Sequence, residues 1–330
     1  MKTLLKILKW FGIITGSIII LLIISVYAMY SNKFEAPLPT IQASTDSSII
    51  ARGKYLAYGP MHCASCHVPM DKIADVEKGI EVPMTGGWEL DIPPGTFRSV
   101  NLTPDMETGI GKMTDAQIAR ALRHGVAHDG RLLVAFMPFQ KVSDEDLTAL
   151  ISYLRSQAPV KSNLKPTEYK FMGKALIAFG MLKPEGPKVT PPKTVIRDSS
   201  IAYGDYLVNN VANCKGCHTD RSMMTGEFTG PDLAGGHFFA PEAMSEGYGY
   251  IPPNLTPDKE TGVMAEWTET AFINRFHQGR VYKTSPMPWG SFSRMDEIDI
   301  KAIYRYLKSV APVKKKIEKT VFQPGDKMPG

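Results

Sequence analysis

The longest apolar stretch of the chain lies at its N-terminus. After three lysines within the first ten residues, the run from Trp10 to Tyr30 carries no charge and is mostly aliphatic or aromatic. Its 21 residues match the ~20 that cross a bilayer as a helix. A cleaved signal peptide has a shorter apolar core of about 7–15 residues, so the length favours a retained anchor over residues 1–31, although residues 26–28 could form a cleavage site. Lysines before the span place the N-terminus in the cytoplasm and the rest of the chain on the other side.

Beyond this span, the hydrophobic pattern predicts short amphipathic helices between long loops. Thr114 and Gln117 form a capping box, and Gly125 is placed to end the helix that they begin. The loops are rich in Pro and Gly and show no strand alternation, so we expect a mainly α fold. The later helices have apolar residues at i, i+3, i+4 and i+7, namely Leu147, Leu150, Ile151 and Leu154, and Ile300, Ile303, Tyr304 and Leu307.

This pattern occurs twice. Residues 51–67 align without a gap with residues 202–218, at a constant offset of 151. Four matched blocks in one order indicate a duplicated domain. The other blocks are Asn101–Asp105 with Asn254–Asp258, Met137–Pro138 with Met287–Pro288, and Tyr153–Val160 with Tyr306–Val313. The expected units are a linker over 32–47, a first domain over 48–160, a linker over 161–198, a second domain over 199–314 and a tail over 315–330.

The second linker contains an apolar segment, residues 171–182, which only Lys174 interrupts. It can pack between the two domains. It can also form a docking surface for a partner subunit or the membrane, because exposed apolar patches usually mark interfaces.

The size and charge of the chain suit two folded domains and give no indication of nucleic-acid binding. The 330 residues, 43% of them hydrophobic, are enough for two domains of about 100–150 residues, each with its own core. The formal net charge is +5, and without the three N-terminal lysines it is +2. A balance this close to neutral lacks the basic footprint of a nucleic-acid-binding protein.

All four cysteines fall in two Cys-x-x-Cys-His motifs, Cys63–His67 and Cys214–His218. Cys63 and Cys66, and likewise Cys214 and Cys217, have the spacing that lets two thiols of one turn add to the vinyl groups of a haem. The next residue, His67 or His218, then lies beneath the iron as an axial ligand. The spacing is typical of c-type haem attachment, and its two occurrences predict two haems c.

Three other interpretations of the cysteines fit less well. A zinc ribbon needs Cys pairs about 15–20 residues apart, and a thioredoxin-like pair needs a βαβ pattern nearby. Disulfides form in oxidising compartments, but they do not account for a histidine after each pair.

A methionine in the same place of each repeat is the candidate for the sixth ligand. Met137 follows His67 by 70 residues, and Met287 follows His218 by 69. Iron held by His and Met has a raised potential and no vacant position, which suits electron transfer. The other methionines considered, Met84, Met106, Met113 and Met264, have no counterpart in the other repeat and are expected to pack. The histidines His62, His124, His128, His237 and His277 are unmatched as well, and His124 and His277 are expected at the surface or as caps.

With these motifs the chain resembles the cytochrome c subunits of membrane-bound alcohol, sugar and aldehyde dehydrogenases of bacteria. The resemblance covers about residues 48–314 and rests on the two haem motifs and on residues 101–111 and 129–138. It implies two tandem class I cytochrome c-like domains, with Met137 and Met287 as axial ligands. It also implies a single-pass protein of the bacterial inner membrane, with the haem domains in the periplasm.

The chain departs from that family in ways that leave its partner open. Those subunits typically have three haem domains and often a C-terminal membrane attachment, whereas this chain has two motifs and an N-terminal span. Its second repeat has no Gly-Ile-Gly after Glu-Thr-Gly, at residues 263–265. A dehydrogenase subunit, a terminal oxidase and a soluble cytochrome are all compatible redox partners.

These observations predict an electron carrier that is not itself an enzyme. The sequence has no Ser/His/Asp triad, no paired-carboxylate motif and no phosphate-binding glycine loop. The alternatives are a dihaem peroxidase or oxidation of a small sulfur compound at one haem. A peroxidase needs one haem with an open face, and a methionine in both repeats argues for two closed ones.

Overall fold

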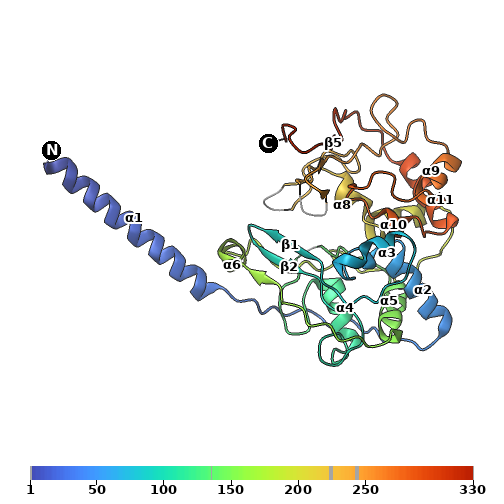
Figure 1. Ribbon diagram of the computed structural model, residues 1–330, viewed down its shortest axis with the longest axis horizontal. Coiled ribbons are helices and arrows are strands. Elements are labelled where there is room, and N and C mark those ends of the chain that lie inside the picture. The colour runs from blue at the N-terminus through green and yellow to red at the C-terminus, as the bar shows by residue number, and fades with distance from the viewer. Residues whose placement is uncertain (1, 135, 223–225, 242–244, 330) are drawn as a thin grey trace.

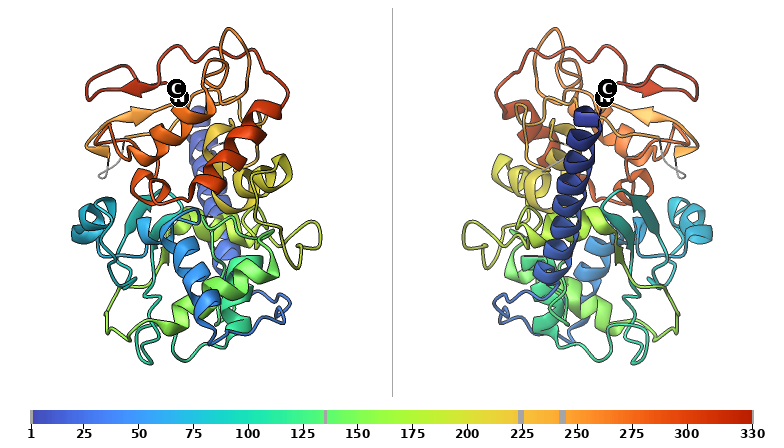
Figure 2. Two further views of the ribbon diagram at one scale, coloured as in Figure 1. Left: turned by 90° about the vertical axis from the view of Figure 1, so that its right-hand side faces the viewer. Right: turned by 90° about the vertical axis from the view of Figure 1, so that its left-hand side faces the viewer.

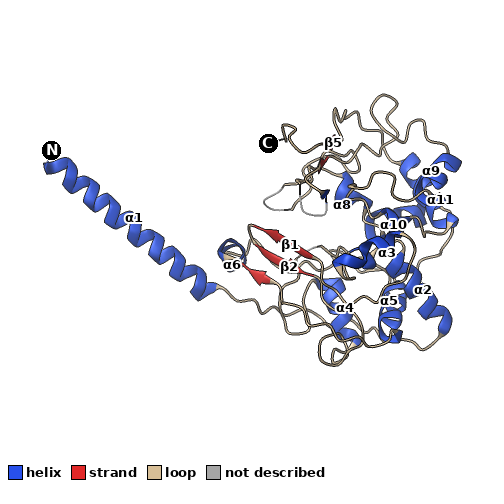
Figure 3. Cartoon of the chain, in the orientation of Figure 1, coloured by secondary structure: helices blue, strands red, loops and turns tan. Residues whose placement is uncertain are grey.

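The computed structural model describes residues 2–134, 136–222, 226–241 and 245–329. The described part is mainly helical, as predicted, with a long apolar helix at the N-terminus and a few short strands (Figures 1 and 3). The α-helices are α1 (Lys2–Met29), α2 (Ser47–Tyr58), α3 (Ile73–Glu77), α4 (Asp115–His124), α5 (Asp144–Ser156), α6 (Phe171–Ala178), α7 (Ile201–Tyr206), α8 (Cys214–His218), α9 (Glu269–His277), α10 (Trp289–Phe292) and α11 (Glu297–Ser309). The other elements are η1 (Cys63–Ser65), η2 (Met70–Lys72), η3 (Leu207–Val211), β1 (Glu89–Ile92), β2 (Gly95–Arg98), β3 (Glu168–Tyr169), β4 (Gly249–Tyr250) and β5 (Val321–Phe322).

Helix α1 extends away from the rest of the molecule (Figure 1). Residues 3–29 are long and apolar enough to cross a membrane, by length and composition. Most of their large side chains are exposed, which in water would be costly for so much apolar surface.

The same pair of helices crosses in each repeat, where the first repeat is residues 48–160 and the second residues 199–314. Helix α2 packs on α5, and α7 packs on α11. A Cβ at Gly53 would collide with the carbonyl oxygen of Ala149, and one at Gly204 with that of Ala302. Only glycine therefore allows the two backbones to approach so closely.

The repeated Asn-Leu-Thr-Pro-Asp loops are fastened in the same way. The side-chain amide of Asn101 donates to the carbonyl of Val160 at 2.8 Å, and that of Asn254 donates to Val313 at 2.8 Å. Each loop is thus tied to the chain that leaves the last helix of its repeat. The capping box of Thr114 and Gln117 is present, and the C-cap Gly125 is left-handed at φ 64°.

Short strands lie in segments that the sequence predicts to be loops. The prediction of loops without strands is therefore wrong at these positions. β1 and β2 form a hairpin around residues 93–94, and β3 adds to its edge. β4 pairs with β5 near the C-terminus. None is longer than four residues, which is too short for a clear alternating pattern.

The repeats lie against each other and exchange equivalent hydrogen bonds (Figures 1 and 2). The Tyr206 hydroxyl of the second repeat donates to the Asp146 carboxylate of the first at 2.9 Å. The equivalent Tyr55 of the first repeat donates to Asp299 of the second. Buried apolar residues of both repeats form one continuous cluster, so the two repeats share a core.

The two segments expected to be linkers both pack against the first repeat. The Phe34 amide donates to the Gly130 carbonyl at 2.8 Å, and the Leu132 amide donates to the Asn32 side chain at 3.0 Å. Helix α6 packs against the β-hairpin and the end of α1. Among the described elements, α6 therefore has its main contacts with α1 and the sheet of the first repeat.

Candidate haem sites

The first Cys-x-x-Cys-His motif forms a single helical turn after α2. The amides of Cys66 and His67 both donate to the Cys63 carbonyl, at 3.2 and 2.9 Å. This turn brings both cysteines and the histidine onto one short piece of backbone. His62 enters it in the left-handed conformation, at φ 42°.

The second motif has the same entry. It forms α8, and Asn213 precedes it at φ 53°. His62 and Asn213 are equivalent in the two repeats, and both residue types tolerate the left-handed region better than most. Sequence reasoning treated His62 as unmatched, although the alignment already placed it opposite a residue suited to this conformation.

Each motif histidine is held by a backbone carbonyl at the same point of its repeat. The Nδ1 atom of His67 lies 2.9 Å from the Val100 oxygen, and that of His218 lies 3.1 Å from the Pro253 oxygen. Both carbonyls belong to the residue before Asn-Leu-Thr-Pro-Asp. A carbonyl only accepts, so Nδ1 carries the proton and Nε2 is left as the basic atom, the state in which histidine binds a metal.

Burial favours the neutral form of both the motif histidines and the motif cysteines. It lowers the pKa of His218 to about 4 and also lowers the pKa of His67, so both imidazoles are neutral, as metal ligands must be. Burial raises the pKa of the Cys63 and Cys214 thiols to about 12. Reactive redox cysteines have a depressed pKa instead, which argues against a thioredoxin-like pair.

The two candidate axial methionines share a local geometry. Met137 and Met287 are both partly buried against the shared core. The carbonyl of Met137 accepts from the amide of Phe139 at 2.9 Å, and that of Met287 accepts from Trp289 at 2.7 Å. A contact two residues apart around a proline is an inverse γ-turn.

The remaining methionines and histidines mostly take structural positions. Met84 and Met264 are completely buried, whereas Met106 is 57% exposed and is not the packing residue that we expected. His124 ends α4. His277 ends α9 and is exposed, as expected of a surface residue, with its Nε2 atom 3.2 Å from the Met295 carbonyl.

The methionine segment of the second repeat touches the haem motif of the first. Helix α10, which follows Met287, packs on α3 and η1. The Ser291 hydroxyl lies 3.2 Å from that of Ser65, one of the two residues between Cys63 and Cys66. No pattern in the sequence indicates this contact, because it joins unrelated parts of the two repeats.

An ion pair reinforces the same contact. The Arg280 guanidinium donates to both carboxylate oxygens of Glu77 in α3, at 2.9 and 2.8 Å. It also donates to the carbonyl of Met287 at 3.2 Å. Arg280 therefore connects the methionine segment of the second repeat to the first repeat.

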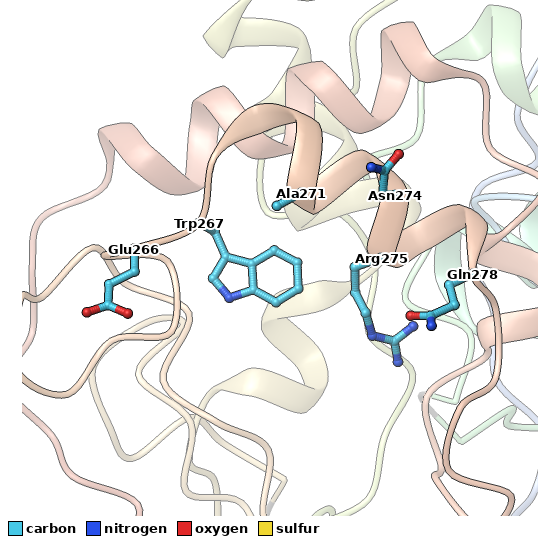
Figure 4. A pocket seen from close by; sticks show the side chains of 6 residues that line it. All are labelled: Glu266, Trp267, Ala271, Asn274, Arg275 and Gln278. Carbon is cyan, nitrogen blue, oxygen red and sulfur yellow. The ribbon is translucent and has the colours of Figure 1, made fainter.

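A pocket of about 750 Å³ opens beside α9 (Figure 4). The Arg275 guanidinium on its wall lies 3.5 Å from the centre of the Trp289 ring, two residues after Met287. The pocket therefore borders the methionine segment of the second repeat. Its lining residues are Glu266, Trp267, Ala271, Asn274, Arg275 and Gln278.

The sequence is similar to those of several known proteins. No family model matches the chain. The chain is 31% identical over 288 residues to the cytochrome c subunit of a quinone alcohol dehydrogenase from Gluconacetobacter polyoxogenes, covering 81% of this chain and 57% of that subunit. It is 31% identical over 297 residues to the gluconate 2-dehydrogenase cytochrome c subunit of Pantoea cypripedii, covering 86% and 64%. A dihaem c-type cytochrome of Cereibacter sphaeroides is 29% identical over 265 residues, covering 76% and 82%.

These relatives confirm the resemblance predicted from the motifs. The chain spans 57% and 64% of the two dehydrogenase subunits, and a larger share, 82%, of the dihaem cytochrome. The likeness therefore extends across both repeats of this chain and leaves part of each longer relative without a counterpart.

Proposed function

Because the chain is a homologue of the cytochrome c subunits of bacterial dehydrogenases, we propose that it is a membrane-anchored electron carrier with two covalently bound haems c. Its repeats would be two tandem class I cytochrome c-like domains. The observation that carries the proposal is the matched tautomer of His67 and His218, each with Nδ1 on a carbonyl and Nε2 available. In both repeats this arrangement leaves Nε2 as the atom that can bind iron.

Eight side chains would hold the haems. Cys63, Cys66, Cys214 and Cys217 would bond the two haems covalently, and His67 with Met137 and His218 with Met287 would bind the irons. Bound haem iron supplies one-electron oxidation and reduction. The carbonyls of Val100 and Pro253 fix the two imidazoles, and His–Met coordination leaves no open position for a substrate.

The contact between the repeats supports transfer within the molecule. Ser65 and Ser291 touch, and each lies within four residues of proposed haem-bonding groups. Short, rigid packing of this kind keeps two redox centres at a fixed separation. The protein's own contribution is to hold and orient the cofactors and to exclude water.

The expected partners follow from the relatives. Two relatives are cytochrome c subunits of dehydrogenases, so we expect a dehydrogenase subunit to donate electrons and a terminal oxidase or a soluble cytochrome to accept them. Helix α1 would span the inner membrane once, with lysines at its cytoplasmic end and the haem domains in the periplasm.

The test is to count the haems and to probe their open positions. A pyridine haemochrome assay should give two haems c per chain, and a count of one or none contradicts the proposal. Met137→Ala should remove about half of the methionine–iron charge-transfer band, since one of two irons loses its ligand. Ready binding of carbon monoxide by the unaltered reduced protein would favour a dihaem peroxidase instead.

A further inference from the structure

Helix α6 is apolar on all of its faces. Lys174 is its only charged residue, and its inward face is formed by Gly173 and Ile177, which are buried. The opposite side is exposed. A helix that is hydrophobic all round is normally covered on every side, by protein or by lipid.

The inward face fixes α6 to the first repeat. The Lys170 amide donates to the Pro94 carbonyl at 3.0 Å, and a Cβ at Gly173 would collide with that same carbonyl. Ile177 is 6% exposed and belongs to a small core with Phe97 and Tyr169. The helix cannot turn its other side inward without breaking this packing.

Four large apolar side chains lie on the outer side of α6 and just after its C-terminal end, and each is about half exposed. Phe171 is 44% exposed, Met172 43%, Phe179 48% and Met181 59%. The chain turns back at Gly180, φ 69°, where the amides of Met181 and Leu182 donate to the Leu176 carbonyl. This turn places Met181 beside the helix end and so widens the apolar surface.

Contacts with α1 place this outer face at the level where α1 would leave the membrane. The rings of Tyr27 and Phe171 lie 6.3 Å apart. The Lys174 ammonium lies 5.3 Å from the Tyr27 ring and 5.8 Å from that of Tyr30. Tyrosines at the end of a spanning helix lie among the lipid headgroups, and Phe171 in contact with one of them would lie at the same depth. Figure 1 shows α6 at the point where α1 joins the rest of the molecule.

The charge around α6 suits a lipid surface. Residues 169–184 contain three lysines, Glu168 and Glu185 flank this range, and Lys170 pairs with Asp91 at 2.7 Å. Lys174 and Lys183 are therefore the basic groups that can face the lipid. Basic residues beside an apolar helix face are attracted to anionic headgroups and let the apolar side chains enter the interface.

We propose that the outer face of α6 lies in the headgroup layer of the bilayer that α1 enters. The inference rests on the membrane anchoring given under Proposed function. Since residues 32–34 also pack on the first repeat, the first repeat would be held against the membrane and would not swing on a free tether. The haem of that repeat would then stay close to redox partners within the bilayer.

Photo-cross-linking to lipid tests this contact in the full, haem-loaded chain. The photoreactive amino acid p-benzoylphenylalanine replaces Phe179 at the C-terminal end of α6, Phe11 in α1 or Ile298 in α11. The protein is placed in vesicles of phosphatidylethanolamine and phosphatidylglycerol. Ile298 is the control, because it is 38% exposed and α11 lies on the side of the molecule away from α1 (Figure 1). Illumination should give at least about tenfold more lipid adduct at position 179 than at 298, as expected of an interfacial helix.

The three positions separate the possible failures. Adducts at position 11 without adducts at 179 would overturn the role of α6 and leave the anchor standing. Equal labelling at 179 and 298 would also overturn it. No adduct at position 11 would contradict the anchor itself and, with it, this inference.

Discussion

The two repeats hold their histidines alike but differ in the structure of the chain after the methionine. In both, a carbonyl before Asn-Leu-Thr-Pro-Asp accepts from the motif imidazole, and a proline turn comes after Met137 or Met287. After Met287 the chain forms α10, which packs on the haem motif of the other repeat. The two repeats thus share the contacts that would hold a cofactor. They differ in the contact between repeats that follows the methionine, which is described only for the second repeat.

The interface itself is partly symmetric and partly not. Tyr55 and Tyr206 donate to Asp299 and Asp146 as a reciprocal pair. The ion pair of Glu77 with Arg280 has no such reciprocity among the described contacts, since it joins α3 of the first repeat to the methionine segment of the second. Symmetric contacts should therefore affect both repeats equally, and the one-sided contact should affect only the second.

The largest effect is expected at the reciprocal carboxylates. Asp146 accepts from Arg52 at 2.9 Å, and Asp299 accepts from Arg197 at 2.9 Å. Asp146→Ala leaves the partly buried Arg52 without its carboxylate partner, which should lower the free energy of unfolding by about 3–5 kcal/mol. Asp299→Ala should cost less, because Arg197 keeps its ion pair with Asp296. Denaturant unfolding followed by circular dichroism measures both losses.

The control for these variants keeps the carboxylate and removes only the tyrosine hydroxyl. Tyr206→Phe should cost about 1–3 kcal/mol, because the hydroxyl also accepts from the buried Ser143 amide at 3.0 Å. A larger loss for Asp299→Ala than for Asp146→Ala would contradict the expected order.

A somewhat smaller effect is expected where the helices cross. A Cβ at Gly53 or Gly204 meets the backbone oxygen of Ala149 or Ala302, so Gly53→Ala and Gly204→Ala should each cost about 3 kcal/mol through overpacking. Gly12→Ala is the control, because nothing lies within 4 Å of its added Cβ. Thermal melting of the full chain distinguishes them, and equal stability of all three variants contradicts the close crossing.

The sequence alone predicts those features that depend on the spacing of nearby residues or on a repeated order of motifs. The capping box at Thr114, the duplicated helices and the matched place of Met137 and Met287 each depend on residues close together or repeated in order. The hydrogen bond between Tyr55 and Asp299 could not be predicted, because it joins residues 244 positions apart and a tyrosine or an aspartate carries no periodic signal for its partner. The place of residues 171–182 was left open for the same reason, since an apolar segment does not specify which surface covers it.

The one-sided contact should show itself in a single haem. Glu77→Gln keeps the size of the side chain but removes the charge that pairs with Arg280, so the methionine segment of the second repeat should loosen by about 1 kcal/mol, as for a partly exposed ion pair. On heating, about half of the methionine–iron band should be lost earlier than in the unaltered protein, since only one of the two irons is affected.

A matched variant tests whether the effect depends on position. Glu107→Gln breaks the Glu107–Lys161 pair, whose side chains are 67% and 59% exposed, and should leave the band unchanged because exposed pairs contribute little. Early loss of the whole band in Glu77→Gln would mean that the ion pair supports both repeats, and the proposed asymmetry would be wrong.

The smallest effect should again be equal in both repeats and should depend on pH. The Asp105 carboxylate accepts from the amide and hydroxyl of Thr108 at 2.6 and 2.7 Å, and Asp258 accepts from Thr261 at 2.8 and 2.6 Å. These hydrogen bonds favour the ionised form and lower the pKa of both aspartates. A lowered pKa in the folded state gives stability that is present above the ordinary pKa of about 4 and is lost as the pH falls through the pKa of the folded state.

Asp105→Asn and Asp258→Asn should therefore lower the melting temperature slightly and equally at pH 7, and the difference from the unaltered protein should shrink toward pH 3. A difference that persists at pH 3 would show that the shape of the loop, and not the carboxylate charge, accounts for the loss.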